Sequence, residues 1–478
     1  GKFALKFKIL LSFLQAIILV LVLQSQPIYA ASITVNTTAD EFNSDGDCSL
    51  REAVQSANTN TGVDNCTAGS GTDTIAVPAG TYVLSILGAG EDANATGDLD
   101  ITSNLTISGA GSASIISGGA IDRVIEVHLG ATTQIDGVTI QNGSSIGFGG
   151  GIFNRGTMTI NESAIDDNET TGPNLSGGGG GIFNQGAMTL TKSTVSNNTS
   201  QGRGGGIYNL DSTLTITNTT ISGNTALNGG GAFNRFGTVN FTNTTIANNI
   251  ATDNGGGVWN FGGTMNLKNT ILSSNTAVTA SDDCAGAITS LGYNIASDSS
   301  CALGGTGDLN NTSPMIGPLA ANGGPTMTHA LLLGGPAIDL VPLASCTVST
   351  DQRGVARPQG AGCDSGSYEH PPTLPQQCSG NIGNYNIIQG TNGNDNLNGG
   401  AGRDLIFAYG GDDKITGGSG NDCLVAGPGA DKLGGGSGKD ILIGGDDDDR
   451  LDGNSGNDNL FGGNGSDDLK GGAGNDLI

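Results

Sequence analysis

The sequence predicts an all-β chain that is built from two solenoids of short parallel strands. Glycine accounts for 84 of the 478 residues, whereas charged residues make up 13% and aromatic residues 4%. Two internal repeats follow one another, the first with a period near 25 residues and the second with a period of nine. Strands this short cannot each bury an apolar face alone, so we expect them to stack as successive coils.

The first repeat is marked by a glycine run, an aliphatic residue, an aromatic residue and an asparagine. The marker begins as Gly149-Gly150-Gly151-Ile152-Phe153-Asn154 and returns as Ile182-Phe183-Asn184, Ile207-Tyr208-Asn209, Ala232-Phe233-Asn234 and Val258-Trp259-Asn260. A second asparagine closes each unit: Asn168, Asn198, Asn224, Asn249 and Asn275. Coils of a parallel β-helix advance about 4.8 Å each, so equivalent asparagines should form hydrogen-bonded ladders. We predict three strands per coil and a β-helix over residues 97–280.

A short amphipathic helix is predicted ahead of the coils, within a cap and first irregular coils that span residues 31–96. Ser49 and Glu52 form a Ser-x-x-Glu capping box. One face of the helix carries Leu50, Ala53, Val54 and Ala57. Such a helix would cover the open end of the first coil, which otherwise exposes apolar core and unpaired strand edges.

The run Cys48-Ser49-Leu50-Arg51-Glu52-Ala53 resembles the N-terminal signature of a family of exported β-helix proteins named CSLREA after that run. The family's C-terminal cap is similar to Asp351-Gln352-Arg353-Gly354-Val355, Arg357-Pro358, Cys363-Asp364 and Gly366-Ser367-Tyr368-Glu369. The resemblance covers roughly residues 33–370 and implies a right-handed, pectate-lyase-like β-helix on a microbial surface. It implies no reaction. Residues 281–370 should form the disulfide-bearing cap, in which Asp351, Arg353 and Arg357 are expected to make ion pairs.

The second repeat fills residues 390–478 with units of nine residues. Position eight of every unit is Leu or Ile, from Leu397 to Ile478. Position six is always aspartate: Asp395, Asp404, Asp413, Asp422, Asp431, Asp440, Asp449, Asp458, Asp467 and Asp476. The pattern resembles the RTX repeat G-G-x-G-x-D-x-U-x. Each unit would form a glycine-rich turn and a short strand with position eight facing inward, and two units would complete one coil of a parallel β-roll.

Aspartates eighteen residues apart would stack along one edge of such a roll. Their carboxylates and the bare carbonyls of the glycine turns supply the hard oxygen ligands that Ca²⁺ prefers. Two edges with four gaps each would hold up to about eight calcium ions. Three units depart from the pattern and put the neighbouring sites in doubt: Ala408 and Tyr409 replace glycines, Ala426 and Pro428 disturb a second unit, and Asp447 replaces a fourth-position glycine.

The N-terminus has the pattern of an export signal. Lys2, Lys6 and Lys8 accompany an apolar stretch from residue 9 to 23, and Ile28-Tyr29-Ala30 resembles a cleavage site, so residues 1–30 are predicted to be a signal peptide. An uncleaved anchor is the alternative. No second apolar segment follows, so we expect no membrane span in the mature chain.

Eight cysteines in an exported chain favour disulfides. Near neighbours pair as Cys48–Cys66, Cys284–Cys301 and Cys346–Cys363, which leaves Cys378 and Cys423 as a further candidate pair. Cys423 occupies position seven of its unit and should point outward from the roll. Residues 371–389 begin with a proline-rich run that predicts an extended linker between the solenoids.

One aromatic residue occupies the same register in each coil: Phe153, Phe183, Tyr208, Phe233 and Trp259. Strand alternation places the flanking aliphatic and asparagine on one side and the ring on the other, so we expect the rings to face outward. They could stack on one another. Alternatively, they form an exposed flat platform for sugar rings or for a partner surface.

The net charge of −26 argues against nucleic acid and anionic membranes as partners and points to cations. We therefore expect a calcium-binding extracellular or cell-surface protein with a structural or adhesive role. The alternative is a polysaccharide-acting lyase, hydrolase or epimerase, because right-handed β-helices are the scaffold of many such enzymes. No catalytic residue is assigned. His128, His329 and His370 are expected to be structural, and an acid–base cluster in a groove would favour the enzyme.

Overall fold

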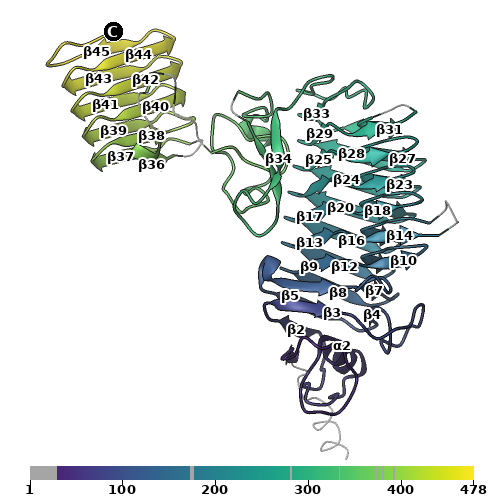
Figure 1. The fold of residues 1–478 in the computed structure, drawn as a ribbon. Helices are drawn as coiled ribbons and strands as arrows, with labels where there is room; N and C mark the ends of the chain where they lie inside the picture. The colour runs from purple at the N-terminus through teal and green to yellow at the C-terminus, as the bar shows by residue number, and fades with distance from the viewer. Residues whose placement is uncertain are drawn as a thin grey trace, which may run out of the picture.

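The computed structural model describes residues 30–172, 177–279, 282–332, 334–371, 375, 377–378, 382–390 and 393–478. The predicted signal peptide, apart from residue 30, lies outside them. Figure 1 shows two stacks of parallel strands, a long one that begins at the N-terminus and a short one at the C-terminus. The prediction of an all-β chain with a parallel β-helix and a parallel β-roll is confirmed.

The long stack is closed by four parallel sheets, here named A to D, whose strands follow one another in each full coil. Sheet A contains β1 (Ser32–Thr34), β2 (Asp73–Val77), β5 (Leu105–Gly109), β8 (Thr132–Asp136), β12 (Thr157–Asn161), β16 (Ala187–Thr191), β20 (Thr213–Thr217), β24 (Thr238–Thr242), β28 (Thr264–Lys268) and β32 (Thr289–Ser290). Sheet B contains β3 (Gly80–Val83), β6 (Ser114–Ser117), β9 (Thr139–Gln141), β13 (Ala164–Asp166), β17 (Thr194–Ser196), β21 (Thr220–Ser222), β25 (Thr245–Ala247), β29 (Ile271–Ser273) and β33 (Ile295–Ala296).

Sheet C contains β4 (Leu99–Ile101), β7 (Ile125–Val127), β11 (Ile152–Asn154), β15 (Ile182–Asn184), β19 (Ile207–Leu210), β23 (Ala232–Arg235), β27 (Val258–Phe261) and β31 (Cys284–Gly286). Sheet D contains β10 (Ser144–Ile146), β14 (Glu169–Thr171), β18 (Thr199–Ser200), β22 (Thr225–Ala226), β26 (Ile250–Ala251) and β30 (Thr276–Ala277). The full coils therefore have four strands rather than the three we predicted. The fourth, in sheet D, is only two or three residues long, and segments this short carry no apolar alternation from which to predict a strand.

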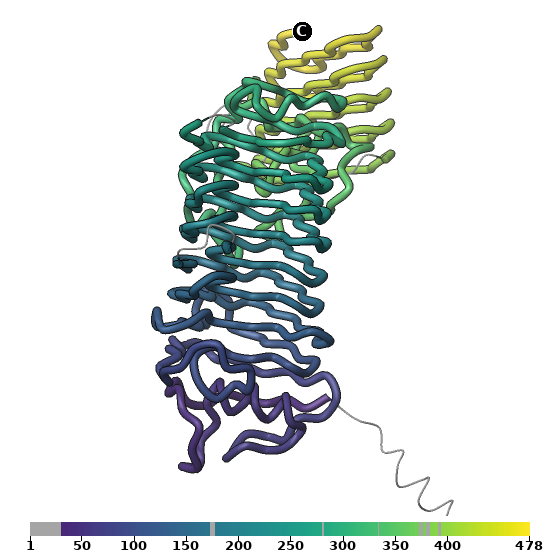
Figure 2. Tube along the Cα trace, turned by 90° about the vertical axis from the view of Figure 1, so that its right-hand side faces the viewer, coloured from purple at the N-terminus to yellow at the C-terminus, as the bar shows by residue number. Residues whose placement is uncertain are grey.

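Stacked aliphatic side chains fill the interior of the β-helix, and the coils lie one above another (Figure 2). The register repeats the sequence period, with Ile182 opposite Ile207 and Asn184 opposite Asn209. Both asparagine ladders are confirmed. Asn184 Nδ2 donates to Asn209 Oδ1 at 2.8 Å in one ladder, and Asn198 Nδ2 donates to Asn224 Oδ1 at 3.0 Å in the other.

Helix α2 (Leu50–Thr59) begins at Ser49 with the predicted capping box. Its predicted apolar face, Leu50, Ala53, Val54 and Ala57, is buried in the same core as the first coils. In Figure 1 it lies at the N-terminal end of the stack, as expected of a cap.

The region after the last coil contains the antiparallel pair β34 (Ile316–Ala320) and β35 (Thr328–Leu331) and the 3₁₀ turn η2 (Leu343–Ser345). Two further 3₁₀ turns, η1 (Gly111–Ala113) and η3 (Ile382–Asn384), lie elsewhere in the described chain. The region after the last coil does more than close the end, because it folds back along the outer face of sheet B. Thr194 donates to the carbonyl of Met327 at 2.6 Å, and Thr220 to Gln352 at 2.7 Å. The expected ion pairs are present: Arg353 with Asp351 at 2.7 Å and Arg357 with Glu369 at 2.8 Å.

The short stack is made of two parallel sheets, here named E and F. Sheet E contains β36 (Asn386–Gln389), β38 (Asp404–Phe407), β40 (Cys423–Pro428), β42 (Ile441–Asp446) and β44 (Asn459–Asn464). Sheet F contains β37 (Asn396–Ala401), β39 (Lys414–Ser419), β41 (Lys432–Ser437), β43 (Arg450–Ser455) and β45 (Asp468–Lys470). Position-eight residues such as Leu424, Leu433 and Leu442 form the core between the sheets, as predicted.

All four predicted disulfides form: Cys48–Cys66, Cys284–Cys301, Cys346–Cys363 and Cys378–Cys423. Cys423 points away from the roll core, as expected, but it is not exposed. It belongs to a separate apolar cluster with Cys378 and Tyr385, which cover that part of sheet E. Among the described residues, no helix is long and apolar enough to cross a membrane.

Candidate metal centre

The nonapeptide turns place the position-six aspartates on two opposite edges of the roll. Edge 1 carries Asp395, Asp413, Asp431, Asp449 and Asp467, and edge 2 carries Asp404, Asp422, Asp440, Asp458 and Asp476. On each edge the backbone N–H of one aspartate donates to Oδ1 of the aspartate eighteen residues later, as from Asp422 to Asp440 at 2.9 Å. The stacking predicted from the sequence is therefore present along both edges.

The second carboxylate oxygen of these side chains is buried without a hydrogen-bond donor. Within the described residues, Oδ2 lacks a partner in Asp404, Asp413, Asp422, Asp431, Asp440, Asp449 and Asp458. A buried acceptor that remains unpaired is costly, and more so when it is charged. Burial raises the pKa of Asp431 to about 7 and those of Asp440 and Asp449 to about 6, and repulsion from the neighbouring aspartates adds to it. These oxygens need a proton or a cation.

A first-position glycine leaves room beside the unpaired oxygens of Asp404, Asp422, Asp440, Asp449 and Asp458. A Cβ on the first-position Gly417 would lie 2.6 Å from Asp422 Oδ2, and one on Gly435 would lie 2.6 Å from Asp440 Oδ2. A side chain on Gly420 would overlap the carbonyl oxygen of Gly402 in the coil before it. Each edge thus combines bare carbonyl oxygens with unpaired carboxylate oxygens, a set of hard oxygen donors that fits Ca²⁺.

The departures from the nonapeptide pattern named above all fall on edge 1, whereas Asn454 replaces a second-position glycine on edge 2. Ala408 and Ala426 put methyl groups at the first position, where edge 2 has only glycine. Tyr409 and Asp447 adopt left-handed backbone angles, φ 73° and 78°, in place of glycine. The two edges are therefore not equivalent.

Tyr409 has a structural reason for replacing glycine. Its hydroxyl donates to the carbonyl of Gln359 at 3.0 Å and accepts from Gln389 Nε2 at 2.8 Å. Gln359 lies in the region that packs on sheet B, so this departure joins the roll to the end of the β-helix (Figure 1).

The comparison with known families identifies the C-terminal repeats. The family model described as the RTX calcium-binding nonapeptide repeat matches in four copies, over residues 389–423, 416–451, 425–460 and 443–478. Residues 389–478 are RTX calcium-binding repeats. The RTX roll covers the C-terminal fifth of the chain, and no curated protein and no solved structure matches the chain. The resemblance of residues 33–370 to the CSLREA family has no support from these comparisons.

The aromatic row on sheet C is less exposed than the sequence predicted. Its rings lie outside the central core, as expected, and form a cluster of their own. Neighbouring rings meet edge to face, with centroids 5.0 Å apart for Phe183 and Tyr208 and 5.1 Å for Tyr208 and Phe233. These three rings are 1–2% exposed. The expectation of an exposed platform is therefore wrong for Phe183, Tyr208 and Phe233.

Loops that precede the sheet C strands explain the burial. Gly179 has φ 72°, and a Cβ there would overlap the carbonyl of Ile182, so the loop doubles back closely over the strand. The ring centre of Phe148, from one such loop, lies 4.5 Å from that of Phe183. The guanidinium of Arg203 lies 5.5 Å from the centre of the Phe233 ring. Phe153 and Trp259, at the two ends of the row, remain half-buried.

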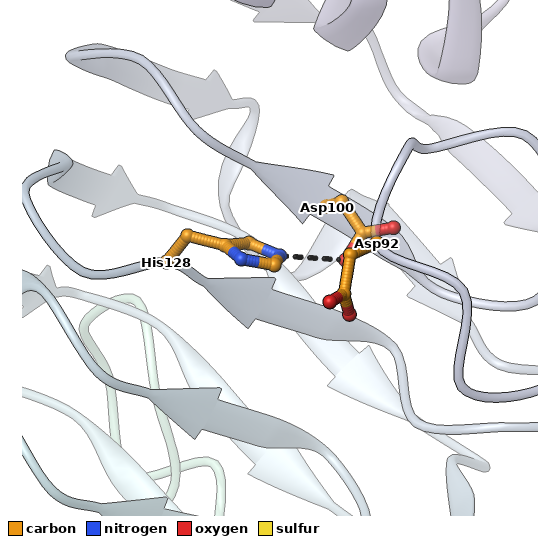
Figure 3. Close-up of side chains that lie close together, drawn as sticks. All are labelled: Asp92, Asp100 and His128. Atoms are coloured by element: carbon orange, nitrogen blue, oxygen red, sulfur yellow. Dashed lines mark hydrogen bonds and ion pairs between the residues drawn. The ribbon is translucent and has the colours of Figure 1, made fainter.

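The same outward row carries carboxylates in the two preceding coils, since Asp100 is opposite Glu126 and Glu126 is opposite Phe153. His128 Nε2 lies 2.9 Å from Asp100 Oδ1, and the exposed Asp92 lies beside this pair (Figure 3). Asp98 joins the group through Arg123 at 2.5 Å, and burial raises its pKa to about 7. Burial also raises the pKa of Asp100.

Sequence reasoning missed this cluster. Asp98 and Asp100 lie in an irregular coil, 26 or more residues before Glu126 and His128, and only the register of β4 with β7 brings them together. The alternation of Leu99-Asp100-Ile101 and Ile125-Glu126-Val127, with the acid on the outer side of each, was the available signal.

Proposed function

We propose that this chain is an extracellular or cell-surface calcium-binding protein with a structural or adhesive role, whose β-helix presents a binding surface for a glycan or a partner. The RTX match, together with the buried, unpaired Oδ2 oxygens of the roll, supports this proposal. Such oxygens repel one another in the absence of a cation, and one inward aliphatic per nine residues buries too little apolar surface to compensate. Calcium therefore controls whether the roll folds.

The ten position-six aspartates are the proposed calcium ligands, with up to about eight ions between them. Extracellular calcium modules bind with a Kd of roughly 10⁻⁴–10⁻³ M. In that range the roll stays unfolded at cytosolic calcium concentrations and folds after export, because a ligand that binds only the folded state stabilises it by mass action. The four disulfides are compatible with an oxidising, extracellular location.

Circular dichroism of the full chain with millimolar calcium and with a chelator tests the calcium-binding part of the proposal. The spectrum should gain β-structure on addition of calcium, in one cooperative transition. A spectrum that does not respond to millimolar calcium would contradict the proposal.

A second function, a polysaccharide-acting lyase, hydrolase or epimerase, is supported by the Asp100–His128 pair and its neighbours. A carboxylic acid with a pKa near 7, such as Asp98, suits general acid–base catalysis at neutral pH. Against this function, Asp98, Asp100 and Glu126 are at most 3% exposed, so the side chains of this group that a sugar chain can reach are His128, Arg123, Arg155 and Asp92. The test is whether the unaltered chain releases reducing or unsaturated sugars from alginate and pectin, and whether Asp100→Asn abolishes that release. If the unaltered chain releases no sugars, the enzymatic function is rejected.

A further inference from the structure

Three aromatic side chains are gathered on the surface where sheet C turns into sheet A. Phe236 is 54% exposed and Phe261 is 46% exposed, and Trp259 beside them is half-buried. The centre of the Phe261 ring lies 5.9 Å from that of Phe236 and 5.9 Å from that of Trp259. We call these three residues the corner platform. It continues the buried aromatic row outward, since Phe233 stacks with Phe261 at 6.3 Å.

Phe236 occupies a backbone position that suits other residues better. Asp211, Phe236 and Gly262 are equivalent turn residues, each two positions after a ladder asparagine, with φ of 51°, 59° and 80°. Aspartate and glycine accept this left-handed region readily, whereas a bulky aromatic residue does so at a cost. Local conflicts of this kind concentrate at functional positions.

The side chain of Phe236 is also held in place by its neighbours. A Cβ on Gly262 would lie 2.8 Å from Phe236 Cε1, so the ring rests directly on the glycine turn of the next coil. The guanidinium of Arg235 lies 5.4 Å from the centre of the same ring. The corner platform is therefore pre-organised rather than a set of independent surface side chains.

The size of the corner platform argues for a small repeating ligand. Phe236 and Phe261 each offer roughly half of the 150–250 Å² of a large aromatic side chain and Trp259 offers less, so the three rings present at most about 300 Å². A stable protein interface needs about 800 Å² on each partner. One or two sugar rings, in contrast, present apolar C–H faces that match aromatic rings and hydroxyl groups at the rim.

The neighbouring strands offer polar groups for those hydroxyls. Thr238 and Thr264 begin β24 and β28 directly after the corner, and Asn240 and Asn266 follow on the same outer face, linked by a hydrogen bond of 2.7 Å. Equivalent side chains on successive strands are about 4.8 Å apart, so hydroxyl and amide groups repeat along the sheet beside the rings.

We infer that the corner platform is a binding site for a polysaccharide chain, with Phe236, Phe261 and Trp259 stacking on sugar rings and Arg235 available for a hydroxyl or a uronic carboxylate. This inference rests on the proposed function as a surface-binding protein and names the ligand class and the site.

Affinity gel electrophoresis and pull-down of the full chain in calcium test the site, with xylan, cellulose and chitin as neutral probes and alginate as the uronic probe. The double variant Phe236→Asn/Phe261→Ser should bind the retained polysaccharide at least about tenfold more weakly. Its melting temperature should not fall, since Asn accepts the left-handed region of the turn. Phe42→Ser is the matched control, because Phe42 is 49% exposed in the N-terminal region, and it should bind like the unaltered chain. Loss of binding in Arg235→Gln for alginate alone would assign the uronic carboxylate to Arg235.

Full binding by the double variant would overturn the site while leaving a glycan-binding β-helix intact. No binding of any of the four polysaccharides by the unaltered chain would overturn the inference itself. The calcium response measured by circular dichroism stands apart from both outcomes, so it tests the proposed function separately. Size-exclusion chromatography gives the remaining outcome: a change of oligomeric state in the double variant, without a change in glycan binding, would reassign the platform to self-association and contradict the inference.

Discussion

In the β-helix, the backbone N–H of Asn168 donates to Oδ1 of Asn198 in the next coil at 3.0 Å, and in the roll the N–H of Asp404 donates to Oδ1 of Asp422 at 2.9 Å. The two ladders use the same first hydrogen bond. They differ in the second atom of the side chain. Asn198 Nδ2 donates to Ile165 and to Asn224, whereas Asp422 Oδ2 has no donor among the described residues.

The two ladders therefore differ in one side-chain atom, Nδ2 in asparagine and Oδ2 in aspartate. The asparagine ladder forms all its hydrogen bonds internally, whereas the aspartate ladder needs an external positive charge. An amide both donates and accepts, so a column of asparagines closes its own hydrogen bonds. A column of carboxylates can only accept, and burial without a donor or a cation is unfavourable. The comparison implies that the β-helix is stable without metal and that calcium completes the roll.

The largest expected effect comes from replacing a ladder asparagine of the β-helix by aspartate, the residue that forms the ladders of the roll. Asn224→Asp puts an unpaired carboxylate against the carbonyl of Val195 and Oδ1 of Asn249, both of which now accept from the amide. Denaturant unfolding should show a loss of about 3–5 kcal/mol at neutral pH.

Asn161→Asp on the outer face of sheet A is the matched control for that variant. Asn161 Oδ1 accepts from Thr191, a role that a carboxylate keeps, so the change should cost far less. Equal losses in the two variants would show that burial of the unpaired oxygen is not the cause.

The reverse exchange tests the roll. Asp440→Asn supplies a donor where an unpaired oxygen stands and removes one charge from edge 2. Since Asp440 lies between Asp422 and Asp458, calorimetric titration should count up to about two fewer calcium ions. An unchanged number of bound ions would mean that this carboxylate is not a ligand.

A smaller effect is expected from making the two edges alike. Gly417→Ala with Gly435→Ala copies the edge 1 methyl groups onto edge 2, where each Cβ would lie 2.6 Å from the unpaired Oδ2 of Asp422 or Asp440. This pair should weaken calcium binding, whereas Ala408→Gly with Ala426→Gly should strengthen it. Calcium affinity is measured by titration of both double variants. If the affinity changes in the same direction in both, the claim that the two edges are inequivalent is contradicted.

The smallest effect is a pH response of the calcium-free chain. The pKa values of Asp431, Asp440 and Asp449 are raised to about 7, 6 and 6, above the ordinary value near 4, so the folded roll binds more protons than the unfolded one between about pH 4 and 7. Its stability therefore rises as the pH falls through this window. In chelator, circular dichroism should show partial recovery of β-structure near pH 4, and a further loss on acidification would oppose this account.

Short-range periodicity explains how much of this fold was predictable. The nine-residue period located each stacked aspartate of the roll, and the 25-residue period located the asparagine ladders, because each coil repeats the environment of the one before it. Three cysteine pairs followed from their near spacing and the expectation of an exported chain, and Cys378 and Cys423 were the pair that remained. These features depend on contacts between adjacent coils.

Features that depend on long-range contacts were not predictable. The packing of the C-terminal region along sheet B uses contacts such as that of Gln352 with Thr194, which are 158 residues apart. No sequence repeat predicts contacts of this kind. Burial of Tyr208 depends on how neighbouring loops fold over the strand, which the alternation of the strand itself does not encode. Tyr409 was visible only as a broken glycine pattern, and its contact with Gln359 supplied the reason.

Hydrogen exchange of the full chain, in calcium and in chelator, tests most directly whether the two ladders differ in their need for metal. The account predicts that chelation removes the protection of amides in residues 393–478, while those of the β-helix coils between residues 97 and 279 stay protected. Roll amides that stay protected in chelator at neutral pH would show that the unpaired aspartate oxygens do not require calcium, and would contradict the account.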